Sequence, residues 1–230
     1  MKNINIKKLS VLLPYYHEGE KNLFSGIKKI KFFLEKKKIP YEIIISQNGS
    51  AKKINLPDDP SLKLVFDKKR GLGRALKNTL PFICGDYCYF SSCEFPFDLS
   101  DLQNLLKLNR DYDLVIGSKL HQDSIYQISY YRKFISILFS YFSSLVLPKF
   151  SIKDPNGTLF AKTMWFKKLA SKVKSDDFFF EIELVFRFFN NNLKIVEVPV
   201  IYIKKNVHSS VNISDGLKYL WQLLLLHRRI

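Results

Sequence analysis

Residues 9–46 read LSVLLPYYHEGEKNLFSGIKKIKFFLEKKKIPYEIIIS, with two short apolar segments on either side of a longer amphipathic one. Leu9–Pro14 and Tyr41–Ser46 are rich in Leu, Ile and Val, which is typical of the buried strands of a parallel sheet. Between them, Glu20–Lys37 repeats apolar residues at helical spacing. The stretch therefore predicts a strand, a crossover helix and a second, parallel strand.

The same alternation continues through the first half of the chain and then becomes less regular. We predict strands at Leu62–Phe66, Tyr87–Ser91, Leu114–Gly117, Thr158–Ala161 and Lys194–Ile203. We predict helices at Leu72–Ile83, Leu99–Leu108 (with Asp98 and Ser100 as candidate caps), Trp165–Val173 and Glu181–Asn190, and a last Leu-rich helix. No linker or repeat is visible, so residues 1–230 are expected to form one α/β domain, a mostly parallel sheet flanked by helices.

Composition narrows the function classes. The chain has 230 residues, 47% of them hydrophobic, which suffices for a real core and excludes a disordered or collagen-like protein. Its 37 Lys and Arg against 21 Asp and Glu give a net charge of +16, which favours an anionic partner. Nucleic acid ranks last among such partners, because no nucleic-acid motif is present and the lysines are spread along the chain.

Cysteine usage and hydropathy indicate the compartment. Cys84, Cys88 and Cys93 are odd in number and have no histidine at metal-ligand spacing, which favours a reducing environment. The apolar run after the basic N-terminus is too short for a signal peptide. The longest apolar stretch, Phe134–Leu147, is interrupted by serines and falls short of the roughly 20 residues that span a bilayer. We therefore expect a cytoplasmic chain without a transmembrane helix.

Eight short motifs follow one another along the chain. They are Pro14-x-Tyr16-x-Glu18, Gly49-Ser50, Gly71-x-Gly73-x-Ala75, Gly85-Asp86-Tyr87, Val115 to Lys119, Asp154 with Gly157, Glu197 to Val200, and Lys205 with Ser210. In this order they resemble glycosyltransferase family 2, of the GT-A fold, and within it the dolichyl-phosphate mannose synthases and related polyprenyl-phosphate sugar transferases. The resemblance covers nearly the whole chain. It implies transfer of a sugar from a GDP- or UDP-sugar to a polyprenyl phosphate.

The resemblance places nucleotide-sugar contacts in the loops after the strands. The implied residues are Pro14, Tyr16, Glu18, Gln47, Arg74, Ser92, Lys205 and Ser210. Tyr16 would pack near the base, and Glu18 would accept a hydrogen bond from the base or ribose, although Glu18 is equally compatible with a solvated helix start. For Gly71 and Gly73, two interpretations stay open: backbone N–H groups that bind a phosphate, or glycines that let a helix approach the sheet.

The acidic motifs of the family are altered. Gln47-Asn48 stands where relatives carry two aspartates, and Ser92-Cys93-Glu94 stands where they carry Asp-x-Asp. Mg²⁺ or Mn²⁺ needs charged oxygen ligands, so Glu94 is the metal candidate and the metal is expected to bind more weakly. Arg74, Lys119 and Lys205 are candidates to replace part of its charge. The catalytic residues implied are Glu94 and Asp154, although Asp154 before Pro155 also suits a turn.

The acceptor side is implied by three residues and a segment. Lys119, Arg132 and Ser136 stand where the lipid-phosphate transferases place an Arg, an Arg and a Ser, and each singly could be an ordinary surface residue. Residues 124–150 are basic at the edges and aromatic within, which favours an amphipathic helix on an anionic membrane face; a buried core helix is the alternative. The Leu-rich C-terminal helix is a candidate second contact.

Three functions remain from these observations. The first is a transferase at the cytoplasmic face of a membrane, with the lipid phosphate as nucleophile and a membrane protein as a further candidate partner. The second is a non-catalytic relative that binds nucleotide or lipid as a regulatory or scaffold subunit, which the altered acidic motifs favour. The third is a transferase acting on a glycan hydroxyl, which would need a carboxylate base.

Overall fold

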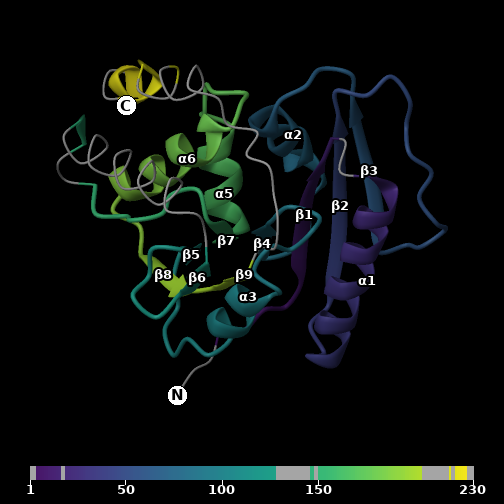
Figure 1. Ribbon diagram of the computed structural model, residues 1–230, viewed down its shortest axis with the longest axis horizontal. Coiled ribbons are helices and arrows are strands. Elements are labelled where there is room, and N and C mark those ends of the chain that lie inside the picture. The colour runs from purple at the N-terminus through teal and green to yellow at the C-terminus, as the bar shows by residue number, and fades with distance from the viewer. Residues whose placement is uncertain are drawn as a thin grey trace.

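The computed structural model describes residues 4–16, 19–127, 146, 147, 150–203, 218 and 221–226. Its core is a seven-stranded sheet in the order β3-β2-β1-β4-β7-β5-β8, and β7 runs antiparallel to both of its neighbours (Figure 1). A second sheet pairs β6 with β9 in parallel. The strands are β1 (Leu9–Tyr15), β2 (Tyr41–Asn48), β3 (Leu62–Asp67), β4 (Tyr87–Phe90), β5 (Leu114–Ser118), β6 (Ile125–Gln127), β7 (Thr158–Lys162), β8 (Ile195–Pro199) and β9 (Ile201–Ile203).

Helices cover both faces of the sheet. They are α1 (Glu20–Lys36), α2 (Leu72–Thr79), α3 (Ser100–Leu105), α5 (Thr163–Ala170) and α6 (Phe179–Asn190). Residues 218 and 221–226 are also helical and pack on α6. None of the described helices is long and apolar enough to cross a bilayer. The expected single α/β domain with a mostly parallel sheet is confirmed.

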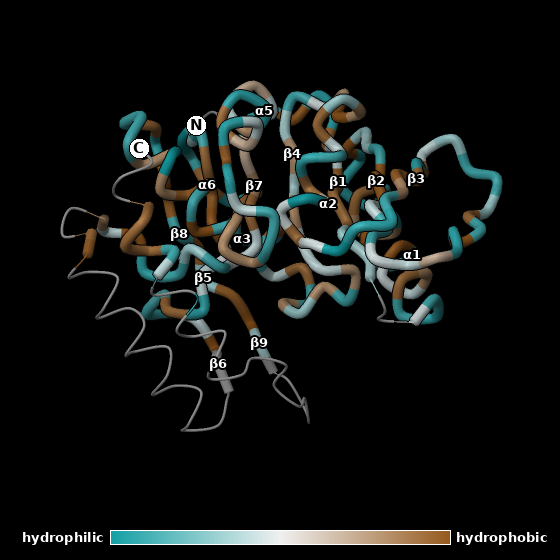
Figure 2. Tube along the Cα trace, turned by 90° about the horizontal axis from the view of Figure 1, so that it is seen from above, coloured by the Kyte–Doolittle hydropathy of each residue, from teal (hydrophilic) through white to brown (hydrophobic). Residues whose placement is uncertain are grey.

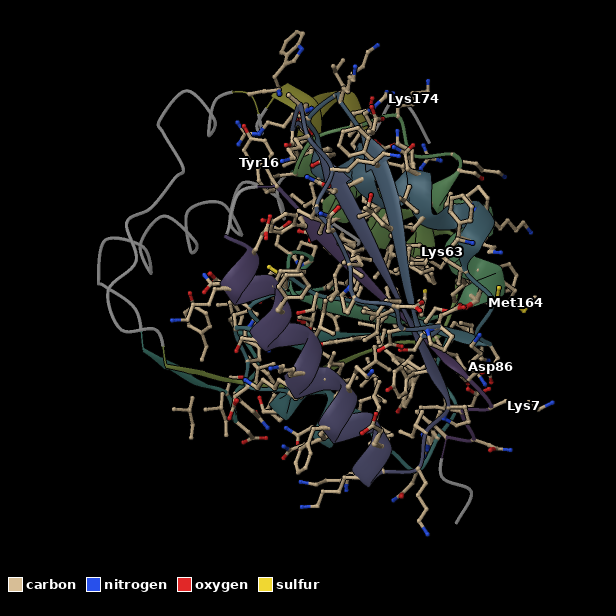
Figure 3. The ribbon with its side chains drawn as sticks, turned by 90° about the vertical axis from the view of Figure 1, so that its right-hand side faces the viewer. Lys7, Tyr16, Lys63, Asp86, Met164 and Lys174 are labelled. Atoms are coloured by element: carbon tan, nitrogen blue, oxygen red, sulfur yellow. The ribbon has the colours of Figure 1, made fainter. Side chains whose placement is uncertain are left out.

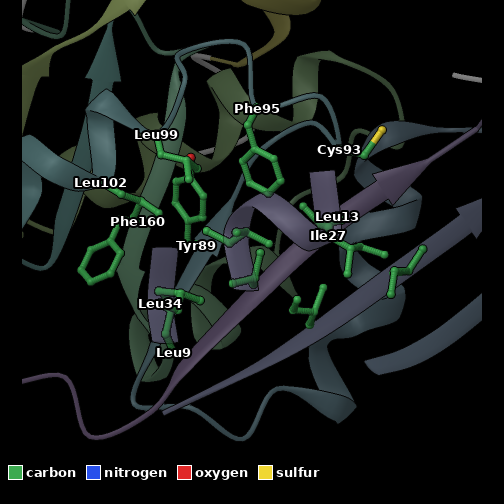
Figure 4. Close-up of a cluster of buried hydrophobic side chains, with 14 of the residues drawn as sticks. Leu9, Leu13, Ile27, Leu34, Tyr89, Cys93, Phe95, Leu99, Leu102 and Phe160 are labelled. Atoms are coloured by element: carbon green, nitrogen blue, oxygen red, sulfur yellow. The ribbon is translucent and has the colours of Figure 1, made fainter. Parts of the chain in front are cut away.

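Alternation along the strands divides the core into two layers. Leu13 and Ile45 face α1 and α3, where they meet Ile27 (Figure 4). Their neighbours Leu12 and Ile44 face α2, α5 and α6. Such period-two burial on both faces explains why these strands read as continuous apolar runs. In Figure 2 the strands carry hydrophobic colours, whereas the connection between β2 and β3 is largely hydrophilic.

Two predicted elements end differently in the structure. The strand predicted at Lys194–Ile203 breaks at Val200, because β8 pairs with β5 whereas β9 pairs with β6. The helix predicted at Leu72–Ile83 stops at Thr79 and continues as a 3₁₀ turn over Leu80–Phe82, where Pro81 offers no N–H.

The prediction that Asp98 caps α3 is wrong. Leu99, at φ 61°, precedes the helix and no side chain caps it. Asp98 forms an ion pair with Lys29 of α1 instead. The Ser100 hydroxyl also does not cap; it donates to the Phe97 carbonyl and accepts from Ile201 N–H at 2.8 Å.

The segment 124–150 lies mostly outside the described residues. Its beginning, Ile125–Gln127, is a strand and not part of a helix. The helix predicted for its middle, and the membrane role attached to it, therefore stay predictions.

Candidate functional site

The polar loops predicted to act together do meet at one end of the sheet. Because β1, β2, β3, β4 and β5 are parallel in direction, the loops that follow them share the carboxyl edge. Figure 3 places Tyr16, just after β1, near this end, and Asp86 and Lys7 at the opposite end. The loops that the sequence assigned to the site therefore lie at the same edge of the sheet.

Tyr16 packs against loops from two other strands. The Arg70 guanidinium carbon lies 4.2 Å from the centre of the Tyr16 ring, within cation–π range. On the β2 side, Gly49 has φ +72°, and a Cβ there would come within 2.6 Å of the ring. Pro14 is half-buried near the end of β1. The stacked Tyr16 and Arg70 form a flat, cationic platform at the carboxyl edge.

Gln47 and Asn48, which replace the aspartates of the resemblance, hold loops together. Gln47 is 2% exposed; its amide donates to the Lys52 carbonyl at 2.8 Å and accepts from Ile54 N–H at 2.9 Å. Asn48 donates to the Gly71 carbonyl at 2.5 Å. A carboxylate cannot donate, so neither position could be aspartate or glutamate without losing the bond that its amide donates. A nucleotide contact from Gln47 stays a prediction.

The N-terminus of α2 is already capped by the loop before α6. Gly73 N–H and Arg74 N–H donate to the carbonyls of Asp177 and Asp176 at 3.3 and 3.1 Å. A Cβ on Gly73 would lie 2.6 Å from the Ser175 carbonyl oxygen. Of the two interpretations left open for these glycines, close approach of the helix is the one that the structure supports.

Arg74, which was expected to bind the diphosphate, forms an ion pair through its Nε atom. Its Nε lies 2.5 Å from an Asp67 carboxylate oxygen, which also accepts from Asn78 at 2.9 Å. These contacts, together with a bond from Lys69 N–H, hold the pKa of Asp67 below its usual value despite partial burial. The guanidinium is therefore anchored at Asp67, the last residue of β3.

The loop after β4 alternates between buried and exposed residues. Ser92 and Glu94 are exposed, whereas Cys93 and Phe95 are buried in the core. Phe95, Asp98 and Leu99 have positive φ, an uncommon conformation for residues with side chains. The apolar side chains therefore anchor the loop and turn Ser92 and Glu94 outward.

One face of α1 holds this loop in place. Asn22 Nδ2 donates to Glu94 Oε1 at 3.2 Å, and Lys29 pairs with Asp98. Between them, Gly26 lies against the backbone of Cys93, so closely that a Cβ would fall far inside van der Waals contact with its carbonyl oxygen. These three helix positions are spaced i, i+4 and i+7, so they share one stripe. That spacing is the sequence signal that could have identified Asn22.

A divalent cation would find one carboxylate here. The described residues contain no cluster of three His, Cys, Asp or Glu suited to a metal ion. Glu94, exposed at the carboxyl edge, offers one carboxylate, which suits a cation whose other ligands are diphosphate oxygens and water. The residues present thus fit a metal carried mainly by its nucleotide.

Lys119 and Asp154 come together at the end of β5. Asp154 is 6% exposed and accepts from the Lys119 N–H at 2.7 Å, with the Lys119 ammonium at 3.4 Å. That ammonium also donates to the Asn156 carbonyl at 3.3 Å. The Asp154 N–H donates to Glu197 of β8 at 3.0 Å. The arrangement fixes one cation and one carboxylate at the carboxyl edge, as the sequence predicted.

Glu181, in the first turn of α6, faces the same pair. Burial raises the pKa of Glu181 to about 8, Lys119 lowers it and Asp154 raises it. Near neutral pH this carboxyl is therefore protonated for most of the time. No sequence signal indicated the raised pKa, which depends on burial.

Glu183, two residues after Glu181 in α6, has a structural role. It is fully buried, and its carboxylate accepts from the Arg187 guanidinium at 2.8 Å, from Lys174 and Ser175 N–H, and from the Ser175 hydroxyl. Burial works to raise its pKa, but these donors outweigh that effect and hold the pKa below the usual value. The pair ties α6 to the loop that caps α2.

The remaining candidates cannot be placed. Glu18, Arg132, Ser136, Lys205 and Ser210 lie outside the described residues. Their expected roles stay predictions.

No family model matches the chain. Solved structures do. Glucosyl-3-phosphoglycerate synthase from Mycobacterium tuberculosis, in complex with Mn²⁺, UDP and phosphoglyceric acid, aligns with a TM-score of 0.69 at 17% identity over 97% of this chain and 78% of that one. The chain has the GT-A fold.

Other complexes of the same synthase align equally well. With Mn²⁺, UDP-glucose and phosphoglyceric acid the TM-score is 0.68 at 19% identity, over 97% of this chain and 79% of that one. With Mg²⁺ and UDP it is 0.65 at 17% identity, with the same coverage. All three structures hold a nucleotide or nucleotide-sugar with a divalent cation, and two of them also hold phosphoglyceric acid.

Proposed function

We propose that this protein is a glycosyltransferase that moves a sugar from a nucleoside-diphosphate sugar to the phosphate of a polyprenyl phosphate, at the cytoplasmic face of a membrane. The observation that carries the proposal is the alignment of 97% of the chain with a nucleotide-sugar-binding GT-A structure. It is supported by the Tyr16 and Lys119 loops, which lie at the carboxyl edge, where ligands bind in α/β sheets.

The nucleotide would lie at the Tyr16 side of the edge. The Arg70 guanidinium on the Tyr16 ring offers a planar, cationic surface for a base and hydrogen-bond donors for its carbonyl oxygens. Glu94 is the residue that would hold Mg²⁺ or Mn²⁺, and a bound cation would neutralise charge on the diphosphate.

The acceptor phosphate would lie at Lys119. A phosphate oxygen forms the new bond to the anomeric carbon of the sugar, while the bond from that carbon to the diphosphate breaks and the nucleoside diphosphate leaves with the electron pair. Because a phosphate is already an anion at neutral pH, no base has to remove a proton. Lys119 then contributes charge neutralisation and position, the terms that dominate such reactions.

A nucleotide-binding panel tests the proposal. Calorimetry with UDP, GDP and ADP, each with Mn²⁺ and with EDTA, is expected to show one preferred base and tighter binding with Mn²⁺. Arg70→Ala should weaken that binding about tenfold, the loss of about 1.4 kcal/mol expected for a stacked cation. Lys36→Ala, an exposed cation at the far end of α1, is the matched control. Failure of every nucleotide to bind would refute the proposal.

The acceptor step should depend on pH through Glu181. Below pH 8 Glu181 is mostly neutral, and the Lys119–Asp154 pair has no net charge; above it, the ionised carboxylate adds a negative charge that repels a phosphate. The KM for the acceptor phosphate is therefore expected to rise as pH increases through about 8. Glu181→Gln should remove this rise, and Glu197→Gln, behind Asp154, should keep it. A rise of equal size in Glu181→Gln would contradict the assignment.

The altered acidic motifs support a second candidate, a relative that binds nucleotide or lipid without turnover. Gln47 and Asn48 serve loop structure, and Ser92 leaves Glu94 as the sole carboxylate of its motif. Nucleotide binding without product from any lipid phosphate would favour this candidate. Product from a glycan hydroxyl would instead favour the third, in which Asp154 would act as base.

A further inference from the structure

We propose that a rim along the carboxyl edge docks on an anionic lipid bilayer. We define the rim by the cations Lys52, Lys53, Lys68 and Lys69 and by the apolar residues Phe178, Trp221 and Leu224. The inference deepens the proposed function, from which it takes the lipid acceptor, and it names a contact face entirely within the described residues.

The basic part of the rim consists of two adjacent loops. The loops after β2 and β3 are joined by a hydrogen bond of 3.1 Å from Gly49 N–H to the Asp67 carbonyl. Lys52, Lys53, Lys68 and Lys69 on these loops are all exposed. Asp67, at the end of β3, forms its ion pair with Arg74 and also accepts from Asn78. The loops therefore present a concentrated positive charge.

The apolar part lies on the C-terminal helical segment and the start of α6. Leu223 and Leu226 are buried against α6. On the outer side, Trp221 is 63% and Leu224 53% exposed, and Phe178 beside them is 58% exposed. Three large apolar side chains left in contact with water on two packed elements form an unusual surface for a chain with so many charges.

The two parts are physically continuous. Asp177 accepts from Gln222 at 3.1 Å and from the Lys218 ammonium at 2.6 Å, which fixes the C-terminal segment on the loop before α6. The same loop caps α2 through Gly73 and Arg74, directly after the basic run that ends at Arg70. Figure 1 shows the C-terminal segment and the tops of β2 and β3 along the same upper edge, and Figure 3 shows Lys174 and Tyr16 there.

The combination of groups selects the occupant. Lysines attract anionic headgroups, and Trp and Leu insert at the boundary between headgroups and acyl chains. A nucleic acid would use the charge but has no apolar layer for Trp221 and Leu224 to enter. The rim also lies at the end of the sheet that carries Lys119, so docking would bring the proposed acceptor site to the membrane.

Vesicle binding by the full-length protein, without nucleotide, tests the charge. Sedimentation with phosphatidylcholine vesicles and with vesicles containing 30% phosphatidylserine is expected to show at least tenfold tighter binding to the anionic ones. Lys68→Glu/Lys69→Glu should reduce that binding tenfold or more. Lys36→Glu/Lys37→Glu makes the same charge change at the C-terminal end of α1, away from the rim, and should keep vesicle binding within twofold. Equal losses in both variants would overturn the proposal.

Tryptophan fluorescence tests insertion. In Trp165→Phe the remaining tryptophan is Trp221, whose emission should shift to shorter wavelength on anionic vesicles. Trp221→Ala should weaken vesicle binding at least threefold, and Phe32→Ala, 69% exposed near the end of α1, should not. No shift, or displacement of the vesicles by an RNA oligonucleotide at equal charge, would overturn the lipid assignment. Unchanged nucleotide binding by these variants separates this result from the proposed function.

Discussion

Replacing Glu183 with glutamine is expected to lower the free energy of unfolding by about 3–5 kcal/mol, because it leaves the buried Arg187 guanidinium without its counter-charge. For a chain of this size such a loss lowers Tm by about 6–20 °C. Nucleotide binding should also weaken, since the loop at Lys174 and Ser175, which leads into the α2 cap, loses its anchor. Scanning calorimetry measures the loss of stability, and titration calorimetry measures the loss of nucleotide affinity.

The effect should depend on pH in a defined direction. The donors around Glu183 hold its pKa below the unfolded value, so the stabilisation is present above the unfolded pKa and is lost as pH falls through the folded pKa. Glu183→Gln should therefore cost most near pH 7 and less in acid. Lys29→Ala, which breaks an exposed ion pair, should cost under about 1 kcal/mol. A Glu183→Gln loss no larger than that of Lys29→Ala would contradict the assigned role.

Gly26→Ala is expected to destabilise the protein although alanine is the better helix former. The gain in helix propensity is about 1 kcal/mol, but the added Cβ collides with the Cys93 carbonyl, a backbone atom that cannot rotate away. Either α1 or the loop after β4 must move, at a cost of about 3 kcal/mol, so the net loss is about 2 kcal/mol. Tm should fall by about 4–8 °C.

The same substitution should move Glu94 and its loop more than it moves the rest of the structure. If Glu94 holds the cation, the Mn²⁺ dependence of nucleotide binding should shrink in Gly26→Ala. Asn22→Ala, which removes the hydrogen bond to Glu94 and adds no atom against Cys93, should reproduce that change with a smaller loss of stability. Ser25→Ala, at an exposed position of α1, is the matched control and should alter neither. An unaltered Tm in Gly26→Ala would contradict the prediction, because it would mean that the loop moves at no cost in stability.

Some of the site was predictable from local sequence. The carboxyl edge carries five of the predicted residues because each lies within four residues of the end of a strand, or of the start of β7, that hydropathy identifies: Tyr16, Ser92, Glu94, Lys119 and Asp154. The resemblance gave Lys119 and Asp154 separate roles, and the structure adds that the two side chains are in contact.

Other features depended on partners distant in sequence. The commitment of the Gly73 N–H to the Asp177 carbonyl joins residues about a hundred positions apart, and no local pattern reports it. The same holds for the raised pKa of Glu181, which needs Asp154 and burial. Asp98 shows the reverse error, since a residue suited to capping by type was drawn into an ion pair with α1.

Hydrophobic periodicity therefore determined the sheet, its helices and the edge at which the loops gather, because burial of apolar side chains acts at every residue and leaves its period in the sequence. Tertiary structure alone decided which polar groups remained available. A hydrogen bond or ion pair is settled by whichever partner the packed chain brings within about 3 Å. For this reason Gln47 forms hydrogen bonds within its loop, Glu183 forms a buried ion pair with Arg187, and the pKa of Glu181 is raised.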